Sequence, residues 1–598
     1  MKSSVSISQE PTIFLSRKLW QFSKGMRLRI VLYLAMFVVA NLIILLPPII
    51  FGSFVREIQM HGIISANFQY LILLLVGLFA TEVFFWAFHG PGRVIENSVA
   101  FWTEIKYREY LLGAVLDLGL SWHGEHDSGD TIDKVNKAGD GVAKFGANVF
   151  QIVQLIVKFL GTSVVLFWFS PPIAIFVFVL VIISFVVIFQ FDRYLVPQYR
   201  RLNEYSNKAM AGVFDALSNV TSVKILHIER PVLVGVMERF KAPYALYNAN
   251  SKLNEAKWFT GALFFQGVAV IPLALYVYWS LSAGTYVDAG TISTLYLYLS
   301  NLIYVYFGFT GFYQELAVYK NQVLNAKPIE DAYTSKELVH REPVPSWETL
   351  TIQNLTFAYE DTSTDPSLRS VHISIKRGER IAVIGESGSG KTTFLKVIHG
   401  LYPSARGRVV FSNREEIQTS FADLDLKTML VPQEPEIFSS TIRENITLGV
   451  AYSEEEILHA TRVANFESVL EDLPKGLDSI INEKGVNLSG GQKQRLALSR
   501  ALLFSKDKEI ILLDESTSSV DSENETEIYQ NIWSAFAEKT VIASIHKMNL
   551  LKLFDRIYIF EKGQVSDSGS FDELLTKNAS FKESWDQFIA TASANKYS

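Results

Sequence analysis

The 598-residue sequence predicts a multidomain membrane protein in which an all-α transmembrane domain of six helices precedes a soluble α/β domain. Three observations lead to this fold class. Six stretches in the first half are apolar over about 20 residues, which is the length that crosses a bilayer. Residues 385–392 read GESGSGKT and fit the phosphate-loop pattern G-x-x-x-x-G-K-[ST]. From Trp347 onward, short apolar runs alternate with helical patterns, as expected of a nucleotide-binding α/β domain.

The membrane helices are expected at residues 30–51, 68–88, 147–170, 173–191, 258–281 and 291–313. Pro47-Pro48 predicts a kink late in the first helix, and Pro171-Pro172 predicts a tight turn between the third and fourth helices. The polar N-terminus has no apolar run ending at a small-residue cleavage site. We therefore expect no removable signal and an uncleaved first helix.

The connections alternate in length, and Lys and Arg gather in the N-terminal segment and in the two long loops, 89–146 and 192–257. By the positive-inside rule these parts, and the phosphate loop with them, are expected to be cytoplasmic. Helical apolar spacing continues through the long loops but is interrupted at residues 121–130 and 217–221, which predicts a turn or short cross-helix at each place.

The chain then divides into an N-terminal segment (1–29), a transmembrane domain (30–313), a polar linker (314–346) and the α/β domain (347–598). A net charge of -6 without a long basic run argues against a nucleic acid partner. The absence of cysteine excludes disulfides, thiolate catalysis, iron–sulfur clusters and cysteine-based zinc sites.

The phosphate loop lies between a predicted strand at 380–384 and a predicted helix at 392–399, which is the context that this motif requires. Its glycines let backbone N–H groups approach phosphates closely, while Lys391 reaches the terminal phosphates and Thr392 reaches Mg²⁺. We expect a nucleoside triphosphate to bind here.

Two further motifs follow. An apolar strand at 509–515 ends in Asp514 and Glu515, which suits an aspartate that organises magnesium and a residue that polarises water. Alone, this pattern fits a buried strand with solvated acids equally well. Residues 488–492 read LSGGQ and lead into a helix predicted to start near Lys493, and glycines at a helix N-terminus form another anion-accepting site.

Together these residues resemble the ATP-binding cassette (ABC) transporter family, specifically a half-size exporter of the type IV fold with an α/β P-loop ATPase cassette. The resemblance covers nearly the whole chain and implies an ATPase coupled to transmembrane transport. It implies catalytic roles for Glu515 (catalytic glutamate), His546 (γ-phosphate switch), Gln433 and Lys391, and adenine stacking for Tyr359. The expected positions for nucleotide binding are Tyr359, Gly385, Glu386, Ser387, Gly388, Ser389, Gly390, Lys391, Thr392, Thr393, Gln433, Ser489, Gly490, Gly491, Gln492 and Asp521, and those for Mg²⁺ are Thr392, Gln433 and Asp514.

In the family, the LSGGQ signature of one cassette closes the phosphate site of another, so the resemblance implies a dimer. Residues 519–521 resemble the loop that crosses between cassettes, and 483–485 resemble the exporter loop that faces the membrane domain. The interruptions at 122–130 and 217–223 resemble the coupling helices. No site position is degenerate, which favours a homodimer; one half of a heterodimer remains the alternative.

Two charges lie inside the predicted membrane helices: Glu82 and Lys158. Counted from the outer ends of their helices, both lie roughly 20 Å deep. They are therefore expected to pair with each other or to face a shared wet cavity, either as a structural ion pair or in contact with a polar part of the substrate. Ser300 and Asn301, in the middle of the sixth helix, are the other candidates for the substrate pathway.

The resulting hypothesis is a homodimeric exporter that moves an amphipathic drug-like compound, lipid or peptide from the cytoplasm or inner leaflet outwards. An ATP-gated channel or regulator is the alternative from another class. The absent signal and cysteines fit a prokaryotic plasma membrane, with an organelle membrane as the alternative.

Overall fold

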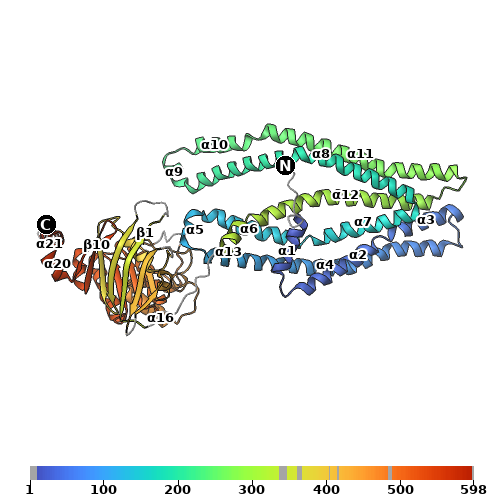
Figure 1. Ribbon diagram of the computed structural model, residues 1–598. Coiled ribbons are helices and arrows are strands. Elements are labelled where there is room, and N and C mark those ends of the chain that lie inside the picture. The colour runs from blue at the N-terminus through green and yellow to red at the C-terminus, as the bar shows by residue number, and fades with distance from the viewer. Residues whose placement is uncertain are drawn as a thin grey trace. The chain divides into compact units, whose positions relative to one another are not determined.

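The computed structural model describes residues 10–335, 346–359, 366–402, 405–413, 416–481 and 488–594 (Figure 1). The chain forms two compact units. One contains Met1–Asp117 and Ser128–Thr334, and the other contains Leu118–Asp127 and Ser335–Ser598. The short segment Leu118–Asp127 is thus grouped with the C-terminal part of the chain. Each unit is described by itself below.

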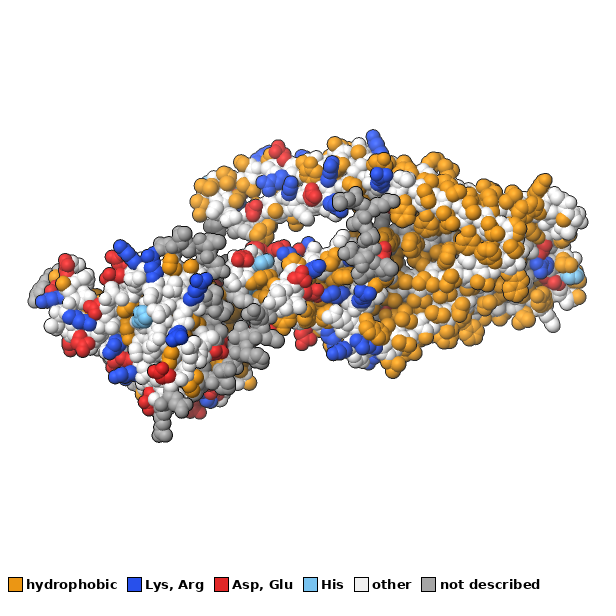
Figure 2. Space-filling model, viewed as in Figure 1, with side chains coloured by type: hydrophobic (Ala, Val, Ile, Leu, Met, Phe, Trp, Pro, Cys, Tyr) orange, Lys and Arg blue, Asp and Glu red, His pale blue; other side chains and the backbone are white. Residues whose placement is uncertain are grey.

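The first unit is helical. Its elements are α1 (Pro11–Phe22), α2 (Arg27–Ile43), α3 (Pro47–His61), α4 (Phe68–Asp117), α6 (Ser128–Gly146), α7 (Val149–Phe169), α8 (Pro171–Ser218), α9 (Val220–Ile225), α10 (Glu229–Lys241), α11 (Tyr244–Ser282), α12 (Ala289–Leu324) and α13 (Lys327–Ser335). Six helical segments of the described chain are long and apolar enough to cross a membrane, as expected. Figure 2 shows hydrophobic side chains covering much of the visible surface of these helices.

Proline sets the breaks in this unit. The first span is divided where α3 begins at Pro47, and α8 begins at Pro171 directly after α7, so both proline predictions are confirmed. The long loops are continuations of membrane helices: α4 has 50 residues and α8 has 48. The six-residue helices α5 (Leu120–Glu125) and α9 lie at the two predicted interruptions.

Helices extend beyond the expected membrane spans at both ends of this unit. The sixth membrane helix does not end near residue 313, because α12 continues to Leu324 with Leu316 and Val323 still buried. Residues 314–324, at the start of the expected linker, are therefore helical. In the N-terminal segment, α1 buries Leu15 and Leu19 and is joined to α13 by an ion pair of 2.6 Å between Lys18 and Glu330.

A buried carboxylate holds the break between α6 and α7. Glu96 of α4 is fully buried and accepts a hydrogen bond of 2.7 Å from the backbone N–H of Phe150, in the first turn of α7. Arg93 pairs with Glu96 and donates to the carbonyl oxygen of Ala147 at 2.5 Å. An anion at this place satisfies one of the N–H groups that a helix start leaves without a partner, and it opposes the positive end of the helix dipole.

The second unit is the α/β domain together with α5. Its strands are β1 (Thr349–Phe357), β2 (Leu368–Lys376), β3 (Arg380–Gly385), β4 (Arg406–Ser412), β5 (Glu416–Thr419), β6 (Thr428–Val431), β7 (Ile510–Asp514), β8 (Thr540–Ser544), β9 (Arg556–Glu561) and β10 (Gln564–Gly569). Its other helices are α14 (Lys391–Ile398), α15 (Ile442–Thr447), α16 (Glu454–Val463), α17 (Glu467–Asp472), α18 (Gly490–Phe504), α19 (Ser522–Ala535), α20 (Phe571–Lys577) and α21 (Ala579–Ala594).

The strands form a four-stranded sheet in the order β2-β1-β4-β5 and a six-stranded sheet in the order β10-β9-β3-β8-β7-β6. In the larger sheet β3, β8, β7 and β6 run parallel. Ile510 and Leu512 of β7 belong to one hydrophobic core, and Ile511 and Leu513 belong to the core on the opposite face. Burial on both faces explains why the sequence of this strand is apolar without alternation.

A partly buried histidine, His399, caps the C-terminal end of α14. The Nδ1 atom of His399 lies 2.9 Å from the hydroxyl oxygen of Thr428, and that hydroxyl donates to the carbonyl of Leu424. The Nδ1 atom of His399 is therefore the donor in this contact. Burial, with a smaller contribution from Lys508, lowers the pKa of His399 from 6.5 to about 4.

This shift predicts acid sensitivity. Between pH 6.5 and 4 the unfolded chain binds a proton at His399 that the folded chain excludes, so this stabilisation is present above pH 6.5 and is lost as the pH falls. From pH 7 to pH 5 we expect a loss of about 1–2 kcal/mol from this residue. Thermal unfolding of His399→Gln should show a smaller pH dependence than the wild type, whereas the exposed His372→Gln should not. Equal slopes for both variants would contradict the assignment.

Candidate nucleotide-binding site

The candidate site lies at one edge of the larger sheet. β3 leads into the phosphate loop, β6 is followed by Gln433, β7 ends at Asp514 and is followed by Glu515, and His546 comes two residues after β8. Since these four strands are parallel neighbours, their carboxyl ends meet at the same edge. Segments that are far apart in the sequence are thereby brought together.

The phosphate loop has the backbone that its glycines predict. Gly385, Gly388 and Gly390 have φ angles of 151°, 80° and 103°, which favour glycine, and a Cβ atom at Gly385 would lie 2.3 Å from the carbonyl oxygen of Phe560. The buried Lys391 ammonium donates to the loop's own carbonyls, to Gly385 at 2.8 Å and Glu386 at 3.1 Å. Burial lowers the pKa of Lys391, and the nearby carboxylates of Glu515 and Asp514 oppose that shift.

The buried atoms of this loop fit an anion. The hydroxyl oxygen of Ser389 is buried and has no hydrogen-bond partner among the described residues. Within the described part of the chain, the Lys391 ammonium donates hydrogen bonds only to neutral carbonyls of the same loop. A phosphate group carries the charge and the acceptor oxygens that both side chains lack.

Thr392 and Asp514 form the part of the site suited to a divalent cation. The Thr392 hydroxyl donates to Asp514 Oδ1 at 2.9 Å, and the Asp514 side chain is almost fully buried. Burial raises the pKa of Asp514, although the Thr392 hydrogen bond opposes the rise. The described residues contain no cluster of three His, Cys, Asp or Glu that could hold a metal alone. One hydroxyl and one carboxylate fit Mg²⁺, which takes a few protein ligands with phosphates and water.

Glu515 is held between two side chains. Its Oε2 accepts a hydrogen bond of 2.7 Å from Gln433 Nε2, and its Oε1 lies 2.5 Å from His546 Nε2. Glu515 also has a positive φ of 45°, which is uncommon for a residue with a side chain and is typical of functional sites. Glu515, Gln433 and His546 line one cavity of about 400 Å³ together with Ser367, Ser387, Gly388, Gly390, Lys391, Thr392 and Thr393.

The predicted aromatic lies beside this cavity. The Tyr359 hydroxyl is 3.1 Å from the hydroxyl of Thr393, in the first turn of α14, and 55% of Tyr359 is exposed. An exposed ring next to the phosphate-loop helix can accept a planar base on its face.

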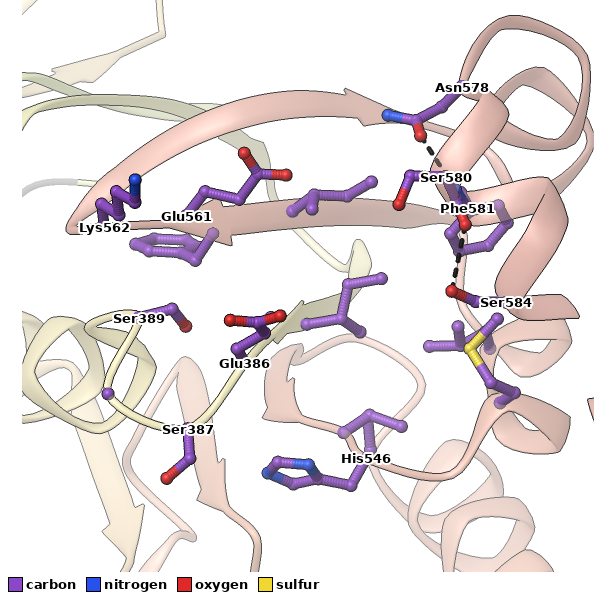
Figure 3. Close-up of a pocket in the computed structure, with 18 residues that line it drawn as sticks. Glu386, Ser387, Ser389, His546, Glu561, Lys562, Asn578, Ser580, Phe581 and Ser584 are labelled. Atoms are coloured by element: carbon purple, nitrogen blue, oxygen red, sulfur yellow. Dashed lines mark hydrogen bonds between the residues drawn. The ribbon is translucent and has the colours of Figure 1, made fainter.

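A second cavity of about 550 Å³ adjoins the first and shares Ser387, Gly388 and His546 with it. In Figure 3, Ser387 and Ser389 lie at one side of this cavity, and Asn578, Ser580, Phe581 and Ser584 lie at the other. Glu386, at the start of the phosphate loop, lines this second cavity rather than the first.

The signature residues lie elsewhere. Ser489 caps α18 and accepts from the backbone of Gln492, so the helix starts at Gly490 and not near Lys493; the glycines form its first turn because the capping box fixes the start. Ser489 and Gly490 are exposed, and neither glycine of the signature lines either cavity. Asp521 is also outside them and caps α19 by accepting from the backbone N–H of Asn524 at 3.1 Å.

One residue that sequence reasoning missed connects these loops. Gln494 is buried, accepts from the backbone N–H of Ser519 at 2.8 Å and donates to the Ser518 hydroxyl at 3.0 Å. The sequence feature that could have identified Gln494 is a polar residue on the inward face of a helix, two residues after the signature. The expected exporter loop at 483–485 lies outside the described residues.

Direct pairing of Glu82 with Lys158, one of the two expected arrangements, is not found among the described residues. Glu82 is exposed on α4 and accepts from the Trp86 indole at 2.9 Å, while the Lys158 ammonium lies 4.4 Å from the centroid of the Tyr304 ring. A count of residues along each helix estimates depth but not the face that a residue occupies, so the two side chains need not meet. On α12, the Ser300 hydroxyl donates to the carbonyl of Tyr296 at 2.8 Å, and Asn301 is partly buried.

Two family models match the chain. The model described as "ABC transporter transmembrane region" covers residues 30–306, and the one described as "ABC transporter" covers residues 368–518. The chain is 35% identical over 235 residues to an ATP-dependent lipid A-core flippase of Syntrophus aciditrophicus, covering 39% of this chain and 38% of the relative. It is 25% identical over 541 residues to the multidrug resistance-like ATP-binding protein MdlB of Buchnera aphidicola, covering 89% of this chain and 90% of the relative.

A bacterial Atm1-family ABC exporter, solved with ATP bound, has the same fold. The TM-score is 0.80, with 21% sequence identity, and the match covers 94% of this chain and 99% of that chain.

The close approach of α18 to the loop after β7 gives a paired prediction. A Cβ atom at Gly491 would lie 2.8 Å from the backbone oxygen of Ser519, whereas at Gly490 the nearest atom is at an ordinary 3.5 Å. Gly490→Ala should leave stability unchanged or raise it by up to about 1 kcal/mol through helix propensity. Gly491→Ala should lower it by about 1–3 kcal/mol through overpacking. Thermal unfolding of the purified chain measures both, and an equal shift in the two variants would contradict this packing.

Proposed function

This chain belongs to the ABC transporter family, and we propose that it is an ATP-driven exporter that works as a homodimer. Its cargo is an amphipathic molecule, either a drug-like compound, a lipid or a peptide, which moves from the cytoplasm or inner leaflet outwards. The names of its relatives, a lipid A-core flippase and a multidrug resistance-like protein, support a cargo of this class.

The observation that carries the ATPase part is the Glu515 carboxylate, held by Gln433 and His546 at the cavity of the phosphate loop. Phosphoryl transfer to water needs positioning and charge neutralisation more than covalent chemistry. Glu515 is placed to orient and polarise the attacking water. Lys391 and His546 face the terminal phosphate, and Tyr359 stacks against adenine.

We further propose that Thr392 and Asp514, with Gln433, hold Mg²⁺ in this site. When bound, the ion neutralises charge on the phosphate oxygens. The Thr392 hydroxyl and the Asp514 carboxylate already lie together at 2.9 Å, so these ligands require little rearrangement.

The position of the signature supports the proposed dimer. Ser489 and Gly490 are exposed at the start of α18, and no signature glycine lines the chain's own phosphate-loop cavity. A second copy would bring its α18 N-terminus, with free N–H groups, to the phosphates. The crossing loop that ends at Asp521 lies beside the signature, since Gly491 approaches Ser519 closely.

We propose that α5 and α9 couple the cassettes to the membrane helices. Both are short helices at the ends of long continuations of membrane helices, and the segment Leu118–Asp127 is grouped with the ATP-binding unit. Rigid helices of this length can transmit cassette closure to the membrane domain. The distribution of Lys and Arg supports a cytoplasmic cassette in a prokaryotic plasma membrane.

Removal of the Glu515 carboxylate tests the ATPase assignment. Glu515→Gln keeps the size of the side chain and one acceptor oxygen, but it replaces the other oxygen with an amide donor and cannot accept a proton from water. We expect turnover to fall by about 10²–10⁴-fold. The measurement is phosphate release by the purified chain in lipid nanodiscs, tested with lipids, dyes and peptides. Unchanged turnover in the variant would exclude Glu515 as the catalytic glutamate, and stimulation by one class of compounds would identify the cargo class.

Mixing of variants tests the shared site. Lys391→Ala spoils the phosphate loop and Gly490→Asp spoils the signature, so each should be inactive alone. Co-assembled, they form heterodimers with one intact site, and we expect recovery of about a quarter of wild-type turnover, since half the dimers are mixed. The matched control is Lys391→Ala with Glu515→Gln, which leaves no intact site and should stay inactive. Absence of recovery in the first mixture would contradict the homodimer.

A further inference from the structure

One cation in the membrane helices has no carboxylate partner. Lys158 lies near the middle of α7, a helix of 21 residues, and is partly buried. Its ammonium group lies 4.4 Å from the centroid of the Tyr304 ring on α12. No ion pair between described residues includes Lys158, and the acidic side chain at its depth, Glu82, is exposed on α4 and bonded to Trp86.

Three other cations on these helices are paired with carboxylates. Arg56 lies 2.5 Å from Asp288, Lys257 lies 2.6 Å from Asp192, and Arg93 pairs with Glu96. Each of these pairs neutralises a charge within the chain. Lys158 departs from this pattern, although a position in the middle of a membrane helix is where an isolated charge is least favourable. An aromatic face attracts a cation but does not neutralise it.

The residues around Lys158 include hydrogen-bond donors and a side that the chain leaves exposed. Tyr304 is 52% exposed, so its ring and hydroxyl are not enclosed by this chain. Asn301 lies one turn away on the same side of α12, and no hydrogen bond joins its amide to another described residue. On the other side of Tyr304, Leu155 packs closely against Gly308, which closes the contact between α7 and α12.

We propose that Lys158, with Asn301 and Tyr304, forms a subsite for an acidic group, a phosphate or a carboxylate, on the transported amphipathic molecule. The proposal rests on the exporter function proposed above and narrows its cargo to anionic amphiphiles. The ammonium donates to the acidic group, and the Asn301 amide and the Tyr304 hydroxyl supply further hydrogen bonds. The acyl or aromatic part of the cargo contacts the apolar helices on either side.

The test uses the full chain in nanodiscs of zwitterionic phosphatidylcholine, so that added probes are the source of acidic amphiphile. The probes share one chain length: dodecyl phosphate, dodecanoate and neutral dodecyl maltoside. The variants are Lys158→Met, which removes the charge, and Lys158→Arg, which keeps it. Lys208→Met, an exposed lysine on the cytoplasmic part of α8, controls for a general change in charge.

Two readouts are compared. The first is the probe concentration that gives half-maximal stimulation of ATPase activity. The second is the probe concentration that gives a half-maximal rise in the thermal unfolding midpoint, measured in chains that also carry Glu515→Gln. We expect the Lys158→Met variant to require about a tenfold higher concentration of acidic probe in both readouts. Its response to dodecyl maltoside should be the same as that of the wild type. Lys158→Arg and Lys208→Met should resemble the wild type. A loss confined to dodecyl phosphate would assign a phosphate, and a loss for both acids would assign a general acidic subsite.

The proposal is overturned if acidic probes act equally on Lys158→Met and the wild type, or if they act no better than maltoside on the wild type. Where Lys158→Met yields too little folded protein, Lys158→Gln takes its place. A Lys158-dependent rise in midpoint in a chain without Glu515-dependent turnover would support the subsite and reject the exporter function.

Discussion

Parallel pairing of β7 with β6 and β8 is the interaction on which the rest of the candidate site depends. It places Gln433, Glu515 and His546 at one edge of the sheet, although up to 113 residues separate them in the chain. The hydrophobic cores on both faces of β7 fix its register, because a slip by one residue would exchange the two faces. The geometry around Glu515 is thus a consequence of apolar packing several residues away.

The α/β domain brings most of the predicted ATPase residues to one cavity but leaves the signature at its surface, where a partner could contact it. Residues of the phosphate loop, Gln433, Glu515 and His546 line one cavity, whereas the signature lies at the start of α18, outside that cavity and with Ser489 and Gly490 exposed. Gln494 and the close approach at Gly491 tie the signature to the loop that follows Glu515. A change at the carboxylate end of β7 can therefore reach the surface that would meet a second copy, through a few direct contacts.

The sequence was sufficient where a local rule dominates. Pro47 and Pro171 mark helix starts, and the glycines of the phosphate loop have the backbone that the motif requires. The sequence was insufficient where the result depends on which face of a helix a residue occupies, or on where a helix begins and ends. Depth alone suggested that Glu82 meets Lys158, but a one-dimensional count carries no information about which side of α4 or α7 a residue occupies. The start of α18 was misplaced by three residues because the capping box outweighs the low helix propensity of two glycines. Continuation of α12 beyond the apolar stretch depends on buried residues in the helical unit that composition does not reveal.

Lys391 in the α/β domain and Lys158 in the predicted membrane helices are both cations without a carboxylate partner among the described residues. Each ammonium is removed from bulk water, and neither forms an ion pair within the described chain. Lys391 is satisfied by carbonyls of its own loop and Lys158 by an aromatic face, both of which are neutral groups. Carboxylates neutralise Arg56, Lys257 and Arg93, so the chain has the means to pair a cation where stability alone is at stake. A buried charge left without its counterion costs stability unless a ligand supplies that counterion, and for this reason we propose both lysines as binding positions. For Lys391 the surrounding motif identifies the anion as a phosphate, and the same reasoning applied in the membrane leads to an acidic group on the cargo.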